Sequence, residues 1–258
     1  MTNFTLSTST KLVASAILAV GLMGCGSGGG GGGSSLPGTA VTLSGTAARG
    51  AALANAAIDI TCANTERVQT TANASGAYSV PATVVYPCVG TATAGAISYR
   101  GILFSGSVAN FTPLTDLLVE TVLAASATGP TSLTVASFLE LARTNSTFAT
   151  SVTSASNALT YRNAVINVVR AQLIAAGRTP EQADATLAAA ANFNSVAFVI
   201  GSAQDQVLDN TGPIILNVNG TVKITVIVSA KNSGDSLPAP TTGNTGTGGT
   251  GGTGGSGT

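Results

Sequence analysis

The sequence contains no histidine and no tryptophan, and only 8% of its 258 residues are charged. Without histidine, the chain lacks the commonest general base and the commonest transition-metal ligand. Ten basic and ten acidic side chains give a net charge of zero, so no basic patch for phosphate contacts is expected and a nucleic-acid partner is excluded. Aromatic residues make up only 4% of the chain. The core must therefore consist mainly of alanine, valine, leucine and isoleucine.

The first 24 residues have the composition of an export signal. Lys11 is their only charge, and it precedes a mostly apolar, uncharged run from Leu12 to Met23. As a helix this run would span roughly 18 Å, which is too short for a hydrocarbon core of about 30 Å. The pattern predicts a secretory signal peptide over residues 1–24.

The signal ends in Leu22-Met23-Gly24-Cys25, which resembles the lipobox of bacterial lipoproteins. The resemblance implies cleavage before Cys25, a diacylglycerol on its thiol and a fatty acyl group such as palmitate on the new amine. Gly26 stands where inner-membrane retention signals usually carry Asp, so the resemblance also implies the outer membrane. An ordinary signal peptide with an incidental cysteine is the alternative.

The other two cysteines are expected to form a disulfide. With Cys25 lipidated, Cys62 and Cys88 remain as an even pair in an exported chain, and an oxidising compartment favours their oxidation. The bond would close a loop of about 26 residues and contribute on the order of 3 kcal/mol. Two buried free thiols are the alternative. No metal site is expected from two thiols without histidine.

Low-complexity segments flank the folded part of the chain. Residues 25–35 form a Gly/Ser linker after the proposed lipid, and residues 236–258 form a Gly/Thr-rich tail that is expected to be disordered. The segment between them divides into two regions. Short stretches of alternating apolar and polar residues dominate residues 36–110, and helical periodicity dominates residues 111–235.

Residues 36–110 predict about seven short strands and therefore a β-sandwich. Alternation of apolar and polar residues is clear at Val41–Gly45 and Ala57–Cys62. Small-residue turns separate these strands from further ones at 70–71, 78–80, 84–86, 97–99 and 101–104.

Three segments of this region resemble the carboxypeptidase regulatory-like (transthyretin-like or prealbumin-like) domain. They are Ser44-Gly45-Thr46, the stretch from Gly50 to Ile58, and the stretch from Thr70 through Asn73 and Gly76 to Tyr78. The resemblance implies an accessory β-sandwich without catalytic residues of its own. The chain departs from the family pattern with Ala52 in place of proline and Asn73 in place of aspartate, and the match covers less than a third of the chain.

Helices are expected after residue 110. Thr112 and Pro113 have the sequence of a helix start, as do Thr179 and Pro180. Other helices are predicted over 133–143, over 155–176 with a stop at Gly177, and over 202–209. The helix at 155–176 places Asn163, Asn167 and Arg170 on one polar stripe and is otherwise largely apolar, so we expect it to be the central helix.

A β-hairpin is predicted to close the fold. Ile214–Val218 and Thr221–Val228 are rich in β-branched residues and are joined by Asn219-Gly220, a strong hairpin signal. Both arms are apolar on both faces, so the hairpin should be covered by the rest of the fold.

The candidate chemical groups are few. Asp116 and Glu120, like Asp205 and Asp209, have a spacing that places both carboxylates on one helical face. A solvated face is the expected explanation for each pair, and acid–base chemistry or calcium binding the alternative. Arg162 and Arg170 are expected to pair with acids such as Glu140, with anion binding as the alternative. No catalytic, cofactor-binding or metal-binding residue is predicted.

These observations predict a non-enzymatic cell-envelope lipoprotein at the outer membrane, with a binding or structural role. Its partners would be the membrane, through the N-terminal lipid, and an envelope protein or polysaccharide. Whether it faces the periplasm or the cell surface, and its oligomeric state, stay open. One alternative is a surface-assembly subunit that uses the apolar hairpin for strand addition. The other is a glycan hydrolase that uses carboxylates alone, Asp116 and Glu120.

Overall fold

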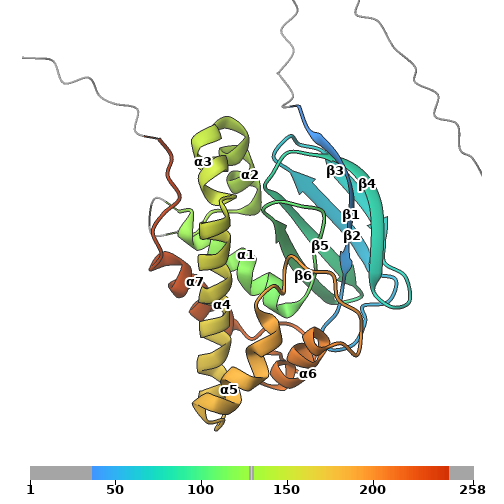
Figure 1. Ribbon diagram of the computed structural model, residues 1–258, viewed down its shortest axis with the longest axis vertical. Coiled ribbons are helices and arrows are strands. Elements are labelled where there is room, and N and C mark those ends of the chain that lie inside the picture. The colour runs from blue at the N-terminus through green and yellow to red at the C-terminus, as the bar shows by residue number, and fades with distance from the viewer. Residues whose placement is uncertain (1–36, 128, 130, 244–258) are drawn as a thin grey trace, which may run out of the picture. The chain divides into compact units, whose positions relative to one another are not determined.

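The computed structural model describes residues 37–127, 129 and 131–243 (Figure 1). The predicted signal peptide, the lipidation site Cys25 and the linker lie outside the described residues, as does the predicted tail from residue 244 onward. The first part of that tail, residues 236–243, is not disordered as expected, because Thr241 N–H donates to the Ser151 hydroxyl and Asn145 Nδ2 donates to the Thr242 carbonyl, both at 2.9 Å. In the described part, six strands precede seven α-helices and one short 3₁₀ helix. This order confirms the predicted mixed architecture, with strands first and helices after them.

The strands form two antiparallel sheets. The smaller sheet pairs β1 (Thr39–Thr46) with β4 (Ala77–Val84). The larger sheet has the order β3-β2-β5-β6, from the strands Arg67–Thr71, Ala57–Cys62, Cys88–Ala94 and Ile97–Leu103. Two predicted short strands near residue 100 are one strand, β6, and the segment after Val84 forms no separate strand. The region therefore has six strands rather than about seven.

The turn between β3 and β4 depends on the side chain of Asn73. Its Oδ1 accepts hydrogen bonds from the backbone N–H groups of Ser75 and Ala77 at 2.9 and 3.1 Å, and from the Ser75 hydroxyl at 2.7 Å. Gly76 follows with a φ of +78°, a conformation that glycine adopts without strain. The strand then resumes with Tyr78, which is buried and donates to the carbonyl oxygen of Ala109 at 2.7 Å.

Helix α1 (Pro113–Ala125) is the central helix, because all of its residues are buried. It begins as predicted, with Thr112 as N-cap and proline at the first helical position, and the Thr115 side chain completes a capping box. It contacts β6, α4, α6 and α7, and Figure 1 shows it between the strands and the outer helices. The expectation that the helix at 155–176 is central was wrong, because that helix keeps an exposed stripe.

The remaining helices follow local signals in most places. α2 (Val135–Thr144), α4 (Ala155–Ala175) and α5 (Pro180–Leu187) lie where predicted, and α5 has the expected capping box. Asn163 and Asn167 are exposed on α4, as expected. α3 (Ser146–Val152) and the 3₁₀ helix Ala188–Ala190 were not predicted. α6 (Ala203–Ile215) extends past the predicted end at residue 209 and includes Pro213.

The predicted C-terminal hairpin was wrong. The first two residues of its first arm, Ile214 and Ile215, end α6, and most of its second arm lies in α7 (Ile224–Asp235), with only a single bridge from Leu216 to Val222 between them. The Asn-Gly sequence does form a turn, in which the Asn217 N–H donates to the Thr221 carbonyl at 2.8 Å.

Packing explains why α7 is helical despite its β-branched residues. Val226, Ala230 and Gly234 recur at intervals of four and are buried. Together they give the helix a face of mostly small residues, and α7 contacts α1 and α4. Burial of that face outweighs the modest preference of valine and isoleucine for strands, because tertiary packing rather than intrinsic propensity supplies most helical stability.

Candidate functional site

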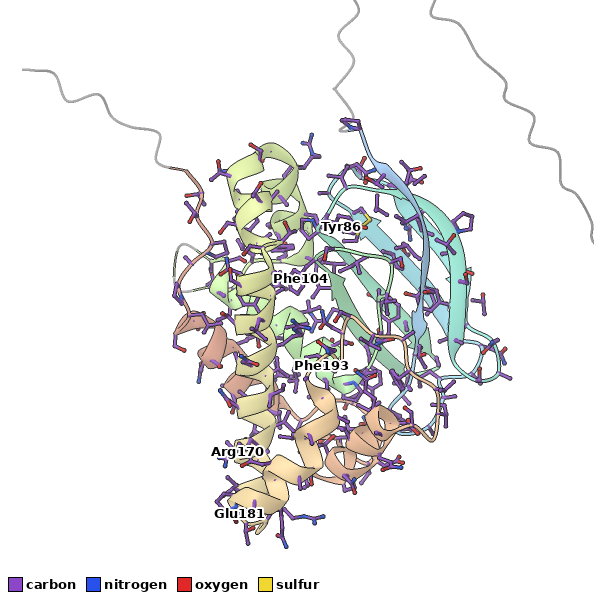
Figure 2. The ribbon with its side chains drawn as sticks, in the orientation of Figure 1. Tyr86, Phe104, Arg170, Glu181 and Phe193 are labelled. Atoms are coloured by element: carbon purple, nitrogen blue, oxygen red, sulfur yellow. A yellow bond between two sulfur atoms is a disulfide. The ribbon has the colours of Figure 1, made fainter. Side chains whose placement is uncertain are left out.

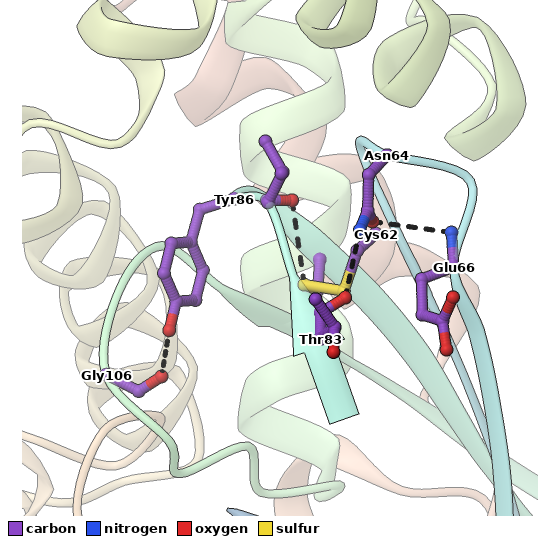
Figure 3. The surroundings of a disulfide bond; sticks show 8 residues. Cys62, Asn64, Glu66, Thr83, Tyr86 and Gly106 are labelled. Carbon is purple, nitrogen blue, oxygen red and sulfur yellow. Dashed lines mark hydrogen bonds between the residues drawn. A yellow bond between two sulfur atoms is a disulfide. The ribbon is translucent and has the colours of Figure 1, made fainter. Parts of the chain in front are cut away.

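Cys62 and Cys88 form a disulfide, as predicted (Figure 3). The two residues are directly paired neighbours on β2 and β5, and each is about 1% exposed. The alternative of two free thiols is therefore wrong. Nearby hydrogen bonds fix the adjoining loops, since Asn64 Nδ2 donates to the Thr83 carbonyl at 2.9 Å and the Tyr86 hydroxyl donates to the Gly106 carbonyl at 2.5 Å. The disulfide is buried and structural in this setting.

Asp116 and Glu120 do not form a solvated face, contrary to expectation. They are 7% and 9% exposed, and both bind Arg100 of β6. Arg100 Nε lies 2.7 Å from an Asp116 carboxylate oxygen, and Arg100 Nη2 lies 2.5 Å from Glu120. Lys231 of α7 lies 3.3 Å from the second oxygen of Glu120. The sequence could not show this arrangement, because both cationic partners come from other elements.

This cluster joins the larger sheet to two helices. Burial opposes the positive charge of Arg100, but the attraction of Asp116 and Glu120 outweighs burial and holds the pKa of the guanidinium above its ordinary value. Two cations face two carboxylates, so the charges balance. Each carboxylate is held by at least one cation from another element. The cluster is best explained as a structural link between β6, α1 and α7.

Asp205 and Asp209 do not act as a pair. Asp205 is 2% exposed, and its Oδ2 accepts a hydrogen bond from the Gly201 N–H at 2.8 Å, while its own N–H donates to the N-cap Ser202. Asp209 lies one turn later and is exposed. Asp205 therefore fixes the start of α6, and the solvated-face explanation fits only Asp209.

The arginines selected from the sequence have different surroundings. Arg170, which is labelled in Figure 2, lies in the C-terminal half of α4 and pairs with Asp184 of α5 at 2.5 Å. Glu140 pairs with Arg143 at 2.6 Å, not with Arg162 or Arg170. Within the described part of the chain, Arg162 has no acidic partner. The expectation of an ion pair is therefore wrong for Arg162, and its charge is uncompensated.

Arg162 lines a pocket of about 210 Å³ between α4 and the segment that follows β6. Ala155, Ala158 and Arg162 lie on one face of α4 and form one wall. Leu103 and Phe104 form an opposite, apolar wall. Phe104 is labelled in Figure 2 and stacks on Tyr161 of α4 with ring centroids 5.9 Å apart.

Two residues that line this pocket, which we call the Arg162 pocket, have buried polar atoms without a partner among the described residues. Arg162 Nη1 donates to Asn192 Oδ1 at 2.9 Å and to the Ser195 hydroxyl at 3.3 Å. Arg162 Nε is buried and has no hydrogen-bond partner among the described residues. Asn194 also lines the pocket, is 4% exposed, and has an equally unpartnered Oδ1. Buried polar groups in proteins nearly always have a partner, but both atoms are closed off from the open space of the pocket and do not by themselves indicate a ligand there.

The sequence identified Arg162 as a possible anion-binding residue but missed Asn194. The stretch Asn192-Phe193-Asn194-Ser195 contains a local signal, since polar residues surround a phenylalanine that the fold buries. That signal does not show which other segments face these residues. The pocket combines positions near 103, 158 and 194, and only the tertiary fold brings them together.

Among the described residues, no helix is both long and apolar enough to cross a bilayer. The same part of the chain has no cluster of three or more acidic or cysteine side chains placed to hold a metal ion. Comparison with protein-family models gives no match, and comparisons with curated proteins and with solved structures give none either. The argument for function therefore depends on the residues themselves.

Proposed function

We propose that the protein is a lipid-anchored protein of the bacterial cell envelope with a non-catalytic binding role at the outer membrane. The observation that carries this proposal is that two of the three cysteines are joined to each other. Cys62 and Cys88 are joined to each other, so Cys25 is the one cysteine left for modification, and it ends an apolar export-type segment with the sequence Leu22-Met23-Gly24-Cys25. A structural disulfide also fits an oxidising compartment outside the cytoplasm.

We further propose that residues 36–110 form a prealbumin-like β-sandwich of the carboxypeptidase regulatory-like type. The turn at Asn73 supports this assignment, because the Asn73 side chain accepts the turn hydrogen bonds that an aspartate would accept. Gly76 and Tyr78 of the same segment have a left-handed conformation and a buried, hydrogen-bonded ring. Buried residues of both sheets also belong to one core, as expected for two stacked sheets. Such a domain is an accessory module that supports binding.

The anchor is tested by the intact mass of the full chain extracted from membranes. We expect a polypeptide that begins at Cys25 and is heavier by a diacylglycerol and an acyl chain, and that separates with the outer membrane. The Cys25→Ser variant should keep residues 1–24 and lack the lipid mass. Cys62 and Cys88 should react with a thiol reagent only after reduction. A wild-type chain of unmodified mass would overturn the proposal.

A further inference from the structure

A pocket of about 320 Å³ lies where the segment after β1 meets α6 and the turn before α7, and we call it the Arg49 pocket. α6 lies beside the end of β1 (Figure 1). We propose that this pocket binds a small zwitterion, an apolar α-amino acid, whose carboxylate contacts Arg49 and whose ammonium group contacts Asp209. The inference rests on the binding role proposed above and names its ligand, but it does not depend on the lipid anchor.

Arg49 and Asp209 are the two charged residues of the lining, and neither has a partner in the described part of the chain. The guanidinium and the carboxylate form no ion pair with each other or with any other described group. A ligand with one charge would satisfy one of these groups and be repelled by the other. A zwitterion satisfies both, and it adds no net charge to the pocket.

Both charged groups can be reached from the open space of the pocket. Asp209 is exposed and Arg49 is half-buried, and none of the Arg49 nitrogens is among the buried polar atoms that lack a partner. The backbone fixes where the charges lie, because Arg49 Nη1 packs against Gly220 and Asp209 Oδ1 packs against Gly50. A Cβ atom added at either glycine would overlap the charged atom. The guanidinium and the carboxylate are therefore held apart without a side-chain partner.

α6 provides a second acceptor for the ammonium group. Pro213 lies inside this helix and has no N–H, so the carbonyl of Asp209, four residues earlier, lacks the donor that an α-helix normally supplies. No backbone N–H from outside the helix donates to that carbonyl among the described residues. Asp209 and Pro213 both line the pocket. An ammonium group has three N–H donors and can bind the carboxylate and the carbonyl of Asp209 together.

The apolar residues of the lining favour an aliphatic side chain on the ligand. Leu208 is buried, Leu216 is half-buried, and Val218 is fully exposed. A branched side chain such as that of leucine would cover Val218 and remove apolar surface from water. A volume of about 320 Å³ is at the lower end for ligand pockets, which suits one amino acid better than a long peptide.

The test is a calorimetric or NMR titration of the full chain in detergent with three ligands of similar shape. Leucine carries both charges, N-acetylleucine carries only the carboxylate, and leucinamide carries only the ammonium group. We expect leucine to bind most tightly. Each of the other two should bind about 10-fold more weakly, because each loses one charge-assisted contact.

Two variants assign each end of the ligand to its residue. Arg49→Gln should weaken leucine binding about 10-fold and leave leucinamide binding unchanged, since leucinamide has no carboxylate to lose. Asp209→Asn should weaken leucine binding by a similar factor and leave N-acetylleucine binding unchanged. The matched controls are Arg178→Gln and Asp235→Asn, which change exposed residues outside the pocket and should not alter any of the three affinities.

Three results would overturn the inference. The first is that leucine does not bind at millimolar concentration. The second is that N-acetylleucine or leucinamide binds as tightly as leucine, since one of the two charges would then contribute nothing. The third is that Arg49→Gln weakens leucinamide as much as leucine. A lipidated chain that fails these tests would overturn this inference alone, and an unlipidated chain that binds leucine would overturn the anchor alone.

Discussion

Tyr161 has a buried hydroxyl without a hydrogen-bond partner among the described residues, although its ring is well packed against Phe104. Removing an unsatisfied buried hydroxyl relieves its desolvation penalty and leaves the aromatic packing intact. We therefore expect Tyr161→Phe to raise the free energy of unfolding by about 1 kcal/mol. Urea denaturation measures this change, and Tyr99→Phe is the matched control, since the Tyr99 hydroxyl donates to the Gly220 carbonyl and its loss should destabilise.

Tyr161→Phe should also change how the free energy of unfolding depends on pH. Burial raises the pKa of Tyr161 to about 12, whereas an unfolded tyrosine ionises near 10. Between these values the folded protein keeps a proton that the unfolded chain releases, so stability is complete below pH 10 and falls as the pH rises toward 12. Tyr161→Phe should lose less stability over this range. Identical pH profiles for wild type and variant would contradict a buried, protonated Tyr161.

At the scale of elements, α7 depends on close contact with α1. A Cβ atom added at Gly234 would lie 2.3 Å from the carbonyl oxygen of Thr121 and 2.9 Å from the Ala124 side chain. Backbone atoms cannot move aside cheaply, so we expect Gly234→Ala to destabilise the protein by about 1–3 kcal/mol, despite the better helix propensity of alanine. Asn232→Ala, at an exposed position of the same helix, is the control and should change stability little. Equal stability of the two variants in urea would contradict the contact.

The elements that the sequence predicts well are those with local signals. Thr112 and Thr179 cap their helices as expected, because a cap requires only a side chain and backbone within three residues. α7 was missed because its sequence favours strand locally, and the helix is explained by the packing of its buried face, Val226, Ala230 and Gly234, against α1 and α4. Likewise, the carboxylates of Asp116 and Glu120 look solvent-facing by spacing, and their burial depends on Arg100 of β6.

At the scale of the whole molecule, the candidate site was predicted only in part. Anion binding was the alternative considered for both Arg162 and Arg170 of the helix at 155–176, and Arg170 binds Asp184 instead. From the sequence, the expectation was the same for both arginines, and they differ in what the fold places beside them. No sequence pattern indicates Asn194, because the residues that line the Arg162 pocket with it are distant in the chain. Phe104, after β6, is about ninety residues earlier, and Arg162, on α4, is about thirty residues earlier.

The disulfide is the covalent constraint of the described fold, and its contribution can be measured separately from that of the lipid. Cys62 and Cys88 are 26 positions apart, and closing a loop of that length stabilises a protein by about 3 kcal/mol in the chain-entropy model. We expect the Cys62→Ala/Cys88→Ala double variant to lose about that free energy of unfolding, and reductant to lower the wild type to a similar level. Urea denaturation with and without reductant measures both changes.

Cys25→Ser is the control for this prediction, because it removes the proposed lipid site and keeps the disulfide. It should retain the full difference between the oxidised and the reduced states. The double variant, in contrast, should be insensitive to reductant. A contradictory result would be that reductant exposes two reactive thiols in the wild type without lowering its stability. The disulfide would then contribute little to the free energy of unfolding, and the hydrophobic core would hold the two sheets together by itself. The buried residues that both sheets contribute to that core, among them Leu43, Ile58 and Ile60, would then carry the stability now assigned to the bond.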